Sequence, residues 1–102
     1  MSMEGAEMNL DLTNAIMEIA REVERAQAKH RPMQGPHEGY AVILEELDEL
    51  WNEVKANRLD LARKEAVQVA AMAVRFLIDL KIPISPLAEI ASAIEAGTFP
   101  QK

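Results

Sequence analysis

The stretch ILEELDELW, residues 43–51, carries apolar side chains at spacings of three and four, which indicates an amphipathic α-helix. Four of its nine residues are acidic: Glu45, Glu46, Asp48 and Glu49. On a helical wheel at about 100° per residue, Glu46 and Glu49 border the apolar stripe and do not lie opposite it. A solvated charged face explains such a pattern, and so does a cation site. Spacing alone leaves both interpretations open.

The same spacing of apolar residues continues on both sides of this stretch and predicts further helices. We expect a first helix from about residue 10 to 29, a second from 38 to 56 and a third from 60 to 81. The short turn at 57–60 returns the third helix antiparallel to the second. A short fourth helix is expected after Ser85-Pro86, because serine caps helix N-termini and proline suits the first helical position.

The fold class predicted is all-α, a small antiparallel bundle of about four helices in one domain, residues 1–102, with a mobile tail at 98–102. Residues 66–78, AVQVAAMAVRFLI, are apolar almost all round the third helix, which predicts burial on every side. One chain this short cannot cover such a helix, so we expect a homo-oligomer, either a dimer or a tetramer. Tyr40 and Trp51 are expected to pack in the core rather than to stack on a base.

Composition excludes several classes of protein. The chain has no cysteine, which excludes disulfide scaffolds, zinc-thiolate sites and cysteine catalysis. No apolar run reaches about 18 residues, so we expect no membrane span, and the acidic N-terminus does not resemble a signal peptide. The expected location is cytoplasmic. The net charge of −6 argues against binding to a nucleic-acid backbone, and a polyanionic substrate would need a metal ion to mediate contact.

A second acidic position lies on the predicted third helix. Glu65 shares a helix face with Gln68 and Met72. If the second and third helices pair about the turn at 57–60, Glu49 and Glu65 lie at similar heights, about 8–10 Å apart between helix axes. Two glutamates facing each other across that gap can hold one divalent ion. Oxygen ligands select hard cations, so the sequence points to Mg²⁺, with Mn²⁺ as an alternative.

These acids form a pattern that resembles a known family. Glu45-Glu46-x-x-Glu49, followed sixteen positions later by Glu65 and then by polar Gln68, is similar to the MazG-like group of all-α nucleoside-triphosphate pyrophosphohydrolases. That group carries a Glu-Glu-x-x-Glu motif on one helix and a Glu-x-x-Asp motif on the next. The resemblance covers roughly residues 37–80. The chain departs from it at Gln68, where an amide replaces the aspartate and brings no negative charge.

The resemblance implies Mg²⁺-dependent hydrolysis of an NTP or dNTP to the monophosphate and pyrophosphate, by a dimer or tetramer. By position, Glu46, Glu49 and Glu65 would be metal ligands, Gln68 a weakened fourth ligand, and Glu45 the residue that orients the attacking water. The alternative is a helical binding or regulatory protein that retains the fold with little or no catalysis, and Gln68 favours it.

Two cations on the third helix, Lys64 and Arg75, are candidates for contacts with the substrate phosphates. Ordinary surface or interface charges explain them equally well. His30 and His37 are expected in a surface loop, where they join no second cluster of ligands. Gln68 lies within an apolar run, so a buried amide there needs partners, either at the metal site or across an interface.

Overall fold

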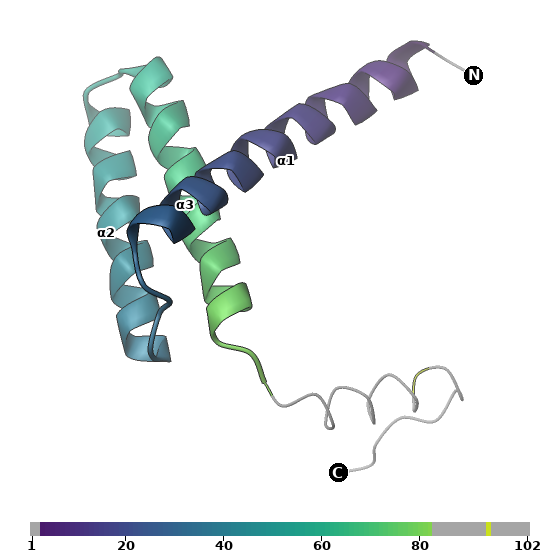
Figure 1. Cartoon of the computed structure of the whole chain (residues 1–102). Helices are drawn as coiled ribbons and strands as arrows, with labels where there is room; N and C mark the ends of the chain where they lie inside the picture. The colour runs from purple at the N-terminus through teal and green to yellow at the C-terminus, as the bar shows by residue number, and fades with distance from the viewer. Residues whose placement is uncertain (1–2, 83–93, 95–102) are drawn as a thin grey trace.

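The computed structural model describes residues 3–82 and residue 94, and these residues contain three α-helices and no strand. Helix α1 spans Met3–Lys29, α2 spans Pro36–Lys55 and α3 spans Leu59–Asp79 (Figure 1). The all-α prediction is confirmed. The expected fourth helix and the tail at 98–102 lie outside the described residues, apart from Ile94.

Helix α1 begins about seven residues before the predicted start at residue 10, and the ends of α2 and α3 agree with prediction to within two residues. Proline stands in the first turn of α2, where its missing N–H is not needed. The turn after α2 is a Schellman motif. Asn57 adopts a positive φ of 58°, and the N–H groups of Asn57 and Arg58 donate to the carbonyls of Val54 and Glu53.

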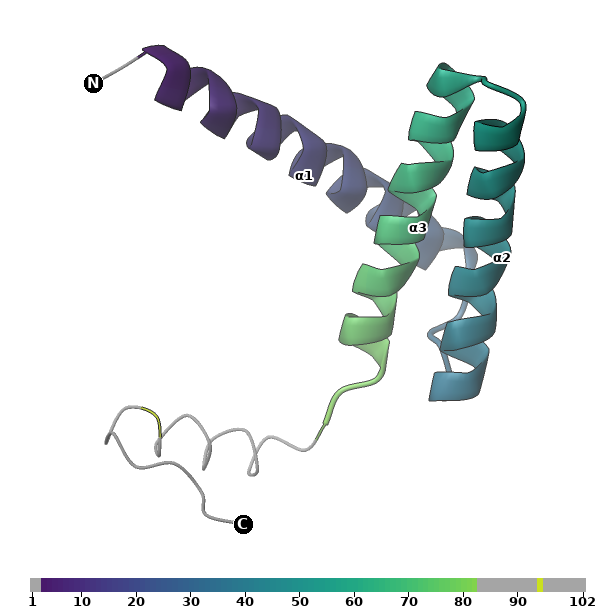
Figure 2. The ribbon, with the colours of Figure 1, turned by 180° about the vertical axis from the view of Figure 1, so that it is seen from behind.

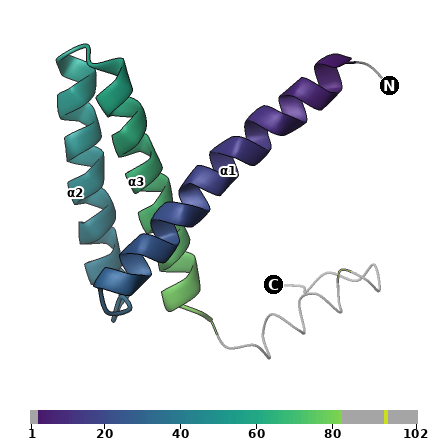
Figure 3. The ribbon, with the colours of Figure 1, turned by 45° about the horizontal axis from the view of Figure 1, so that its top comes forward.

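The arrangement of the helices is a tight antiparallel hairpin crossed by a third helix. Helices α2 and α3 lie side by side along their lengths in all three views (Figures 1, 2 and 3). The C-terminal half of α1 crosses α3, while the N-terminal half extends away from the hairpin (Figure 3). Only the crossing half therefore contributes to the core.

The core is small and lies where α1, α3 and the segment between α1 and α2 meet. Its buried apolar residues are Val23, Ala26, Met33, Ala71 and Met72. Phe76 packs against them from α3, and its ring fills the space over Gly39 of α2. A Cβ atom at Gly39 would lie 2.5 Å from Phe76 Cδ2, so the close approach of the two helices depends on glycine at this position.

Many large apolar side chains of the single chain remain exposed. The prediction that Tyr40 and Trp51 pack in the core of the chain is wrong, since they are 64% and 58% exposed. They lie on the face of α2 that points away from α1 and α3, together with exposed Leu44 and Leu47. Helical periodicity identified an apolar face but could not show that no element among the described residues covers this part of it. None of the described helices is long and apolar enough to cross a membrane.

Candidate functional site

Three glutamates from two helices converge at the hairpin. Glu46 and Glu49 come from α2 and Glu65 comes from α3, and one carboxylate oxygen of each lies within 4.8 Å of the others. Glu46 and Glu65 are half-buried and Glu49 is exposed. We call these three residues the acidic cluster. The short turn after α2 makes the two helices antiparallel, and this brings side chains sixteen positions apart to the same height.

The electrostatics of the acidic cluster favour uptake of positive charge. Burial, and then the neighbouring charges of Glu49 and Glu65, raise the pKa of Glu46 from 4.5 to about 7. Burial and Glu49 also raise the pKa of Glu65. Glu65 Oε2 is buried and has no hydrogen-bond partner among the described residues. The cluster therefore holds a carboxyl oxygen without a hydrogen-bond partner beside two other carboxyl groups.

The raised pKa of Glu46 has a direct consequence for stability without metal. In the folded chain Glu46 keeps its proton up to about pH 7, whereas in the unfolded chain it loses it near pH 4.5. The folded state thus binds more protons between these values, so the free energy of unfolding falls as pH rises through this window. We expect the melting temperature of the metal-free protein to decrease from pH 5 to pH 7.5.

In Glu46→Gln the decrease should be smaller, because the titrating group is gone. Thermal melts in EDTA at both pH values, compared with the same melts of the unaltered protein, measure this difference. Equal slopes for the two proteins would show that Glu46 titrates normally.

A cleft of about 490 Å³ lies next to the acidic cluster, and we call it the main cleft. Glu45, Glu46 and Gln68 are among its lining residues. The basic wall of the main cleft consists of Arg25, Lys29, His30, Arg31 and Arg75. A cleft that is lined by these basic residues and meets the acidic cluster at Glu46 suits a ligand that carries both a metal ion and phosphate groups.

The cations of the basic wall differ in how they are paired. Arg25 forms an ion pair with Glu22 at 2.6 Å, and Arg31 pairs with Glu38 at 3.3 Å. Arg75 is 4% exposed, so it is the one member of the wall that is buried. Its Nη2 donates to the carbonyl of Arg31, 3.1 Å away.

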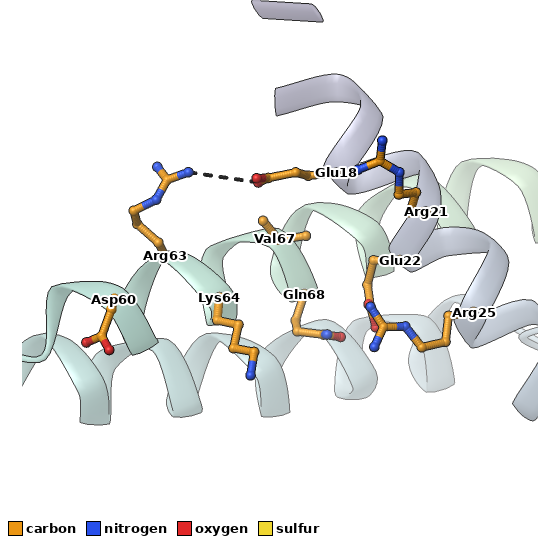
Figure 4. Close-up of a pocket in the computed structure, with 9 residues that line it drawn as sticks. All are labelled: Glu18, Arg21, Glu22, Arg25, Asp60, Arg63, Lys64, Val67 and Gln68. Atoms are coloured by element: carbon orange, nitrogen blue, oxygen red, sulfur yellow. Dashed lines mark ion pairs between the residues drawn. The ribbon is translucent and has the colours of Figure 1, made fainter. Parts of the chain in front are cut away.

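A second cleft, of about 370 Å³, separates α1 from α3, and we call it the side cleft (Figure 4). Lys64 and Gln68 point into it from α3, and Arg63 pairs with Glu18 of α1 at 3.8 Å. Gln68, Glu22 and Arg25 line both clefts, so the clefts adjoin along α1 and α3. Lys64 is thus placed on the side cleft and does not line the main cleft.

The predicted site residues therefore fall into three groups. Glu46, Glu49 and Glu65 come together, Glu45 and Gln68 line the adjoining main cleft, and Lys64 and Arg75 lie on different clefts. Sequence analysis missed the cations that α1 contributes. A signal for them exists, because Arg21, Arg25 and Lys29 repeat at spacings of four and so share one helix face. That face alone does not show which other helix it meets.

His30 was expected to join no other site, yet it lies in the lining of the main cleft. His37 falls within the first turn of α2 and not in a loop. The chain matches no protein-family model, no curated protein and no solved structure. The likeness to MazG-like proteins therefore rests on the residues of the chain itself.

Proposed function

We propose that the chain is a MazG-like pyrophosphohydrolase that converts an NTP or dNTP to the monophosphate and pyrophosphate with Mg²⁺ or Mn²⁺. The observation that carries this proposal is the acidic cluster, in which oxygens from Glu46, Glu49 and Glu65 lie within 4.8 Å of one another. Three carboxylates this close repel one another unless a proton or cation lies among them. The main cleft beside the cluster supplies room for a nucleotide.

The donor set fits a hard divalent cation. It consists of carboxylate oxygens, and the buried Glu65 Oε2 lacks any partner among the described residues. Glu46, Glu49 and Glu65 would hold the ion, and Gln68 would add a neutral amide oxygen. When bound, Mg²⁺ offsets charge on phosphate oxygens and lowers the pKa of a coordinated water.

The remaining residues of the main cleft would bind and orient the substrate. The exposed cations of the basic wall, Arg25, Lys29 and Arg31, would attract the triphosphate into the main cleft. Glu45 lines the cleft beside Glu46, where its carboxylate can accept a proton from the attacking water and align it. Lys64 remains a candidate for a phosphate contact from the side cleft.

The test of the proposal is product analysis. Purified protein is incubated with a panel of NTPs and dNTPs plus Mg²⁺ or Mn²⁺, and released pyrophosphate is measured. We expect release with at least one nucleotide and its loss in EDTA. Absence of pyrophosphate from every nucleotide with either metal would reject the enzymatic function.

The alternative function, nucleotide binding without turnover, is favoured by Gln68 in place of an acid. Thermal melting separates the two, because a ligand that binds only the folded state raises the melting temperature. A rise with Mg²⁺ and nucleotide, together with no pyrophosphate, would identify a binding protein. No rise and no product would reject both functions.

Replacing Gln68 by the aspartate of the MazG-like motif tests whether residue 68 belongs to the metal site. Gln68→Asp adds a negatively charged oxygen ligand next to the acidic cluster. We expect the Mg²⁺ concentration for half-maximal activity to fall by roughly tenfold, which is the usual effect on metal affinity of changing one residue at or beside a metal site. Gln68→Asn is the matched control, since it shortens the side chain equally without adding charge. Equal metal dependence in Gln68→Asp and Gln68→Asn would place residue 68 outside the metal site.

We also propose that a second copy of the chain covers the exposed apolar face of α2 and completes a bundle of about four helices. Support comes from the four large side chains that this face exposes: Tyr40, Leu44, Leu47 and Trp51. Sedimentation of the unaltered protein measures its mass in solution. A monomer at all concentrations would contradict this assembly.

A further inference from the structure

The segment that joins α1 to α2, residues 30–35, is fastened to α3 by two charged side chains. Arg75 Nη2 donates to the carbonyl oxygen of Arg31 at 3.1 Å. Asp79 Oδ2 accepts from the backbone N–H of Met33 at 2.9 Å. Arg75 and Asp79 also face each other one helical turn apart, with Nη2 and Oδ2 3.9 Å from each other.

The ion pair between Arg75 and Asp79 is buried, which sets it apart from the other ion pairs of the described residues. The side chains of Arg75 and Asp79 are only 5% and 8% exposed, whereas every other described ion pair has at least one partner more than half exposed. Hydrogen bonds to charged groups are about twice as strong as neutral ones, and burial shields them from water. Met33, the residue they hold, is itself 3% exposed and touches the Gly39 position of α2.

The fastened segment forms one rim of the main cleft. His30, Arg31 and Met33 all line that cleft, and so does Arg75. Nη1 of Arg75 contacts Met72 Sδ at 3.5 Å and Nη2 donates to the carbonyl of Arg31, so both terminal nitrogens of this guanidinium already contact the protein. The buried Arg75 Nε has no partner among the described residues, which makes the pair costly to bury and argues for a positional role over a stabilising one.

We infer that Arg75 and Asp79 form a latch that holds the rim 30–35 in place, and that Arg75 is a positioning residue for the nucleotide, not a direct phosphate contact. The latch keeps His30 and Arg31 in the lining of the main cleft. This inference rests on the proposed function for its substrate. The fastening of the rim can be measured separately.

The test is the double variant Arg75→Met/Asp79→Leu, studied in the full chain. Removing both charges together leaves no unpaired buried ion, and apolar residues of similar size keep the packing, so this variant is expected to fold. Arg75→Lys is the second variant, which keeps the charge but loses the forked donor. Arg58→Lys is the matched control, because Arg58 binds Glu53 at 2.8 Å and 3.0 Å near the turn at 57–60, away from the main cleft.

Two readouts are needed, hydrogen exchange of the Met33 amide and steady-state hydrolysis. In the double variant we expect Met33 to exchange roughly 10- to 100-fold faster, as loss of a charged hydrogen bond implies. We expect KM for the nucleotide to rise about tenfold with kcat within about threefold, because the rim binds and does not react. Arg75→Lys should lie between the double variant and the unaltered protein, and Arg58→Lys should match the unaltered protein in both readouts.

Each contrary outcome has a separate meaning. Unchanged Met33 exchange in the double variant would overturn the latch, and faster exchange with unchanged KM would overturn its positioning role. A fall in kcat at constant KM would move Arg75 into the chemistry and also overturn the inference. Failure of the proposed function appears instead in the unaltered protein, as no pyrophosphate and no nucleotide binding. In that case the positioning role of Arg75 is rejected too. Hydrogen exchange of the Met33 amide still shows whether Arg75 and Asp79 hold the segment 30–35 in place.

Discussion

Glu65→Gln is expected to lower pyrophosphate release by at least roughly two to three orders of magnitude, the scale seen when one electrostatic group of a reacting site is lost. Glu65 is the only acid that α3 brings to the acidic cluster, and its Oε2 is buried without a partner among the described residues. An amide keeps the size of the side chain and removes its charge. A metal ion held between α2 and α3, as proposed, would thus lose its ligand from one of the two helices.

The same variant should be more stable than the unaltered protein in EDTA. Burial and the charge of Glu49 raise the pKa of Glu65, which means that its ionised form is unfavourable in the folded chain. Removing the charge relieves that repulsion, so the melting temperature at pH 7.5 should rise. A loss of activity together with a higher melting temperature is expected for a functional residue, whereas a structural residue would lower the melting temperature when replaced.

Glu24→Gln is the matched control for this experiment, because Glu24 is exposed on α1 and lines neither cleft. It should leave both activity and melting temperature near those of the unaltered protein. Full activity in Glu65→Gln would show that the acidic cluster is not the metal site, and a lower melting temperature would show that Glu65 serves the fold.

Gly39→Ala is expected to destabilise the fold by about 1–3 kcal/mol, the usual cost of overpacking. The added Cβ would lie 2.5 Å and 2.8 Å from two ring carbons of Phe76 and 3.2 Å from Met33 Sδ. Alanine favours a helix over glycine by about 1 kcal/mol, which opposes this effect without outweighing it. Urea unfolding at one fixed protein concentration measures the change.

Two further variants isolate the contact with Phe76. Gly35→Ala is the matched control, since nothing lies within 4 Å of its added Cβ, and we expect a change within about 0.5 kcal/mol. In a Phe76→Leu background the clash is relieved, so Gly39→Ala should become neutral or stabilising by up to about 1 kcal/mol. An equal cost of Gly39→Ala in both backgrounds would show that Phe76 is not the obstacle.

The hairpin and the acidic cluster were predictable from the sequence because both depend on local rules. Apolar spacing marked α2 and α3, and the turn at 57–60 set their antiparallel pairing. Once two helices are antiparallel about a known turn, their residues can be matched by counting outward from it. That count placed Glu49 and Glu65 at one height, and the structure brings their carboxylates together.

Other parts of the site were not predictable, because they depend on how α1 meets the hairpin. The basic wall exists only where the end of α1 faces α3, and no local pattern gives that crossing. Arg75 within an apolar run was open to several interpretations, and only its contacts with Arg31 and Asp79 assign it to the rim. The exposure of Tyr40 and Trp51 likewise follows from the absence of a covering element among the described residues.

The sequence by itself determined the helices, the hairpin turn and the acids that meet across it, since backbone preferences and helical periodicity act over a few residues. Tertiary structure decided which cations line the cleft beside those acids, which apolar face no described element covers and what Arg75 holds. Those outcomes depend on the angle at which α1 crosses α3. That angle is set by packing between side chains that are far apart in the sequence, so local sequence patterns do not predict it.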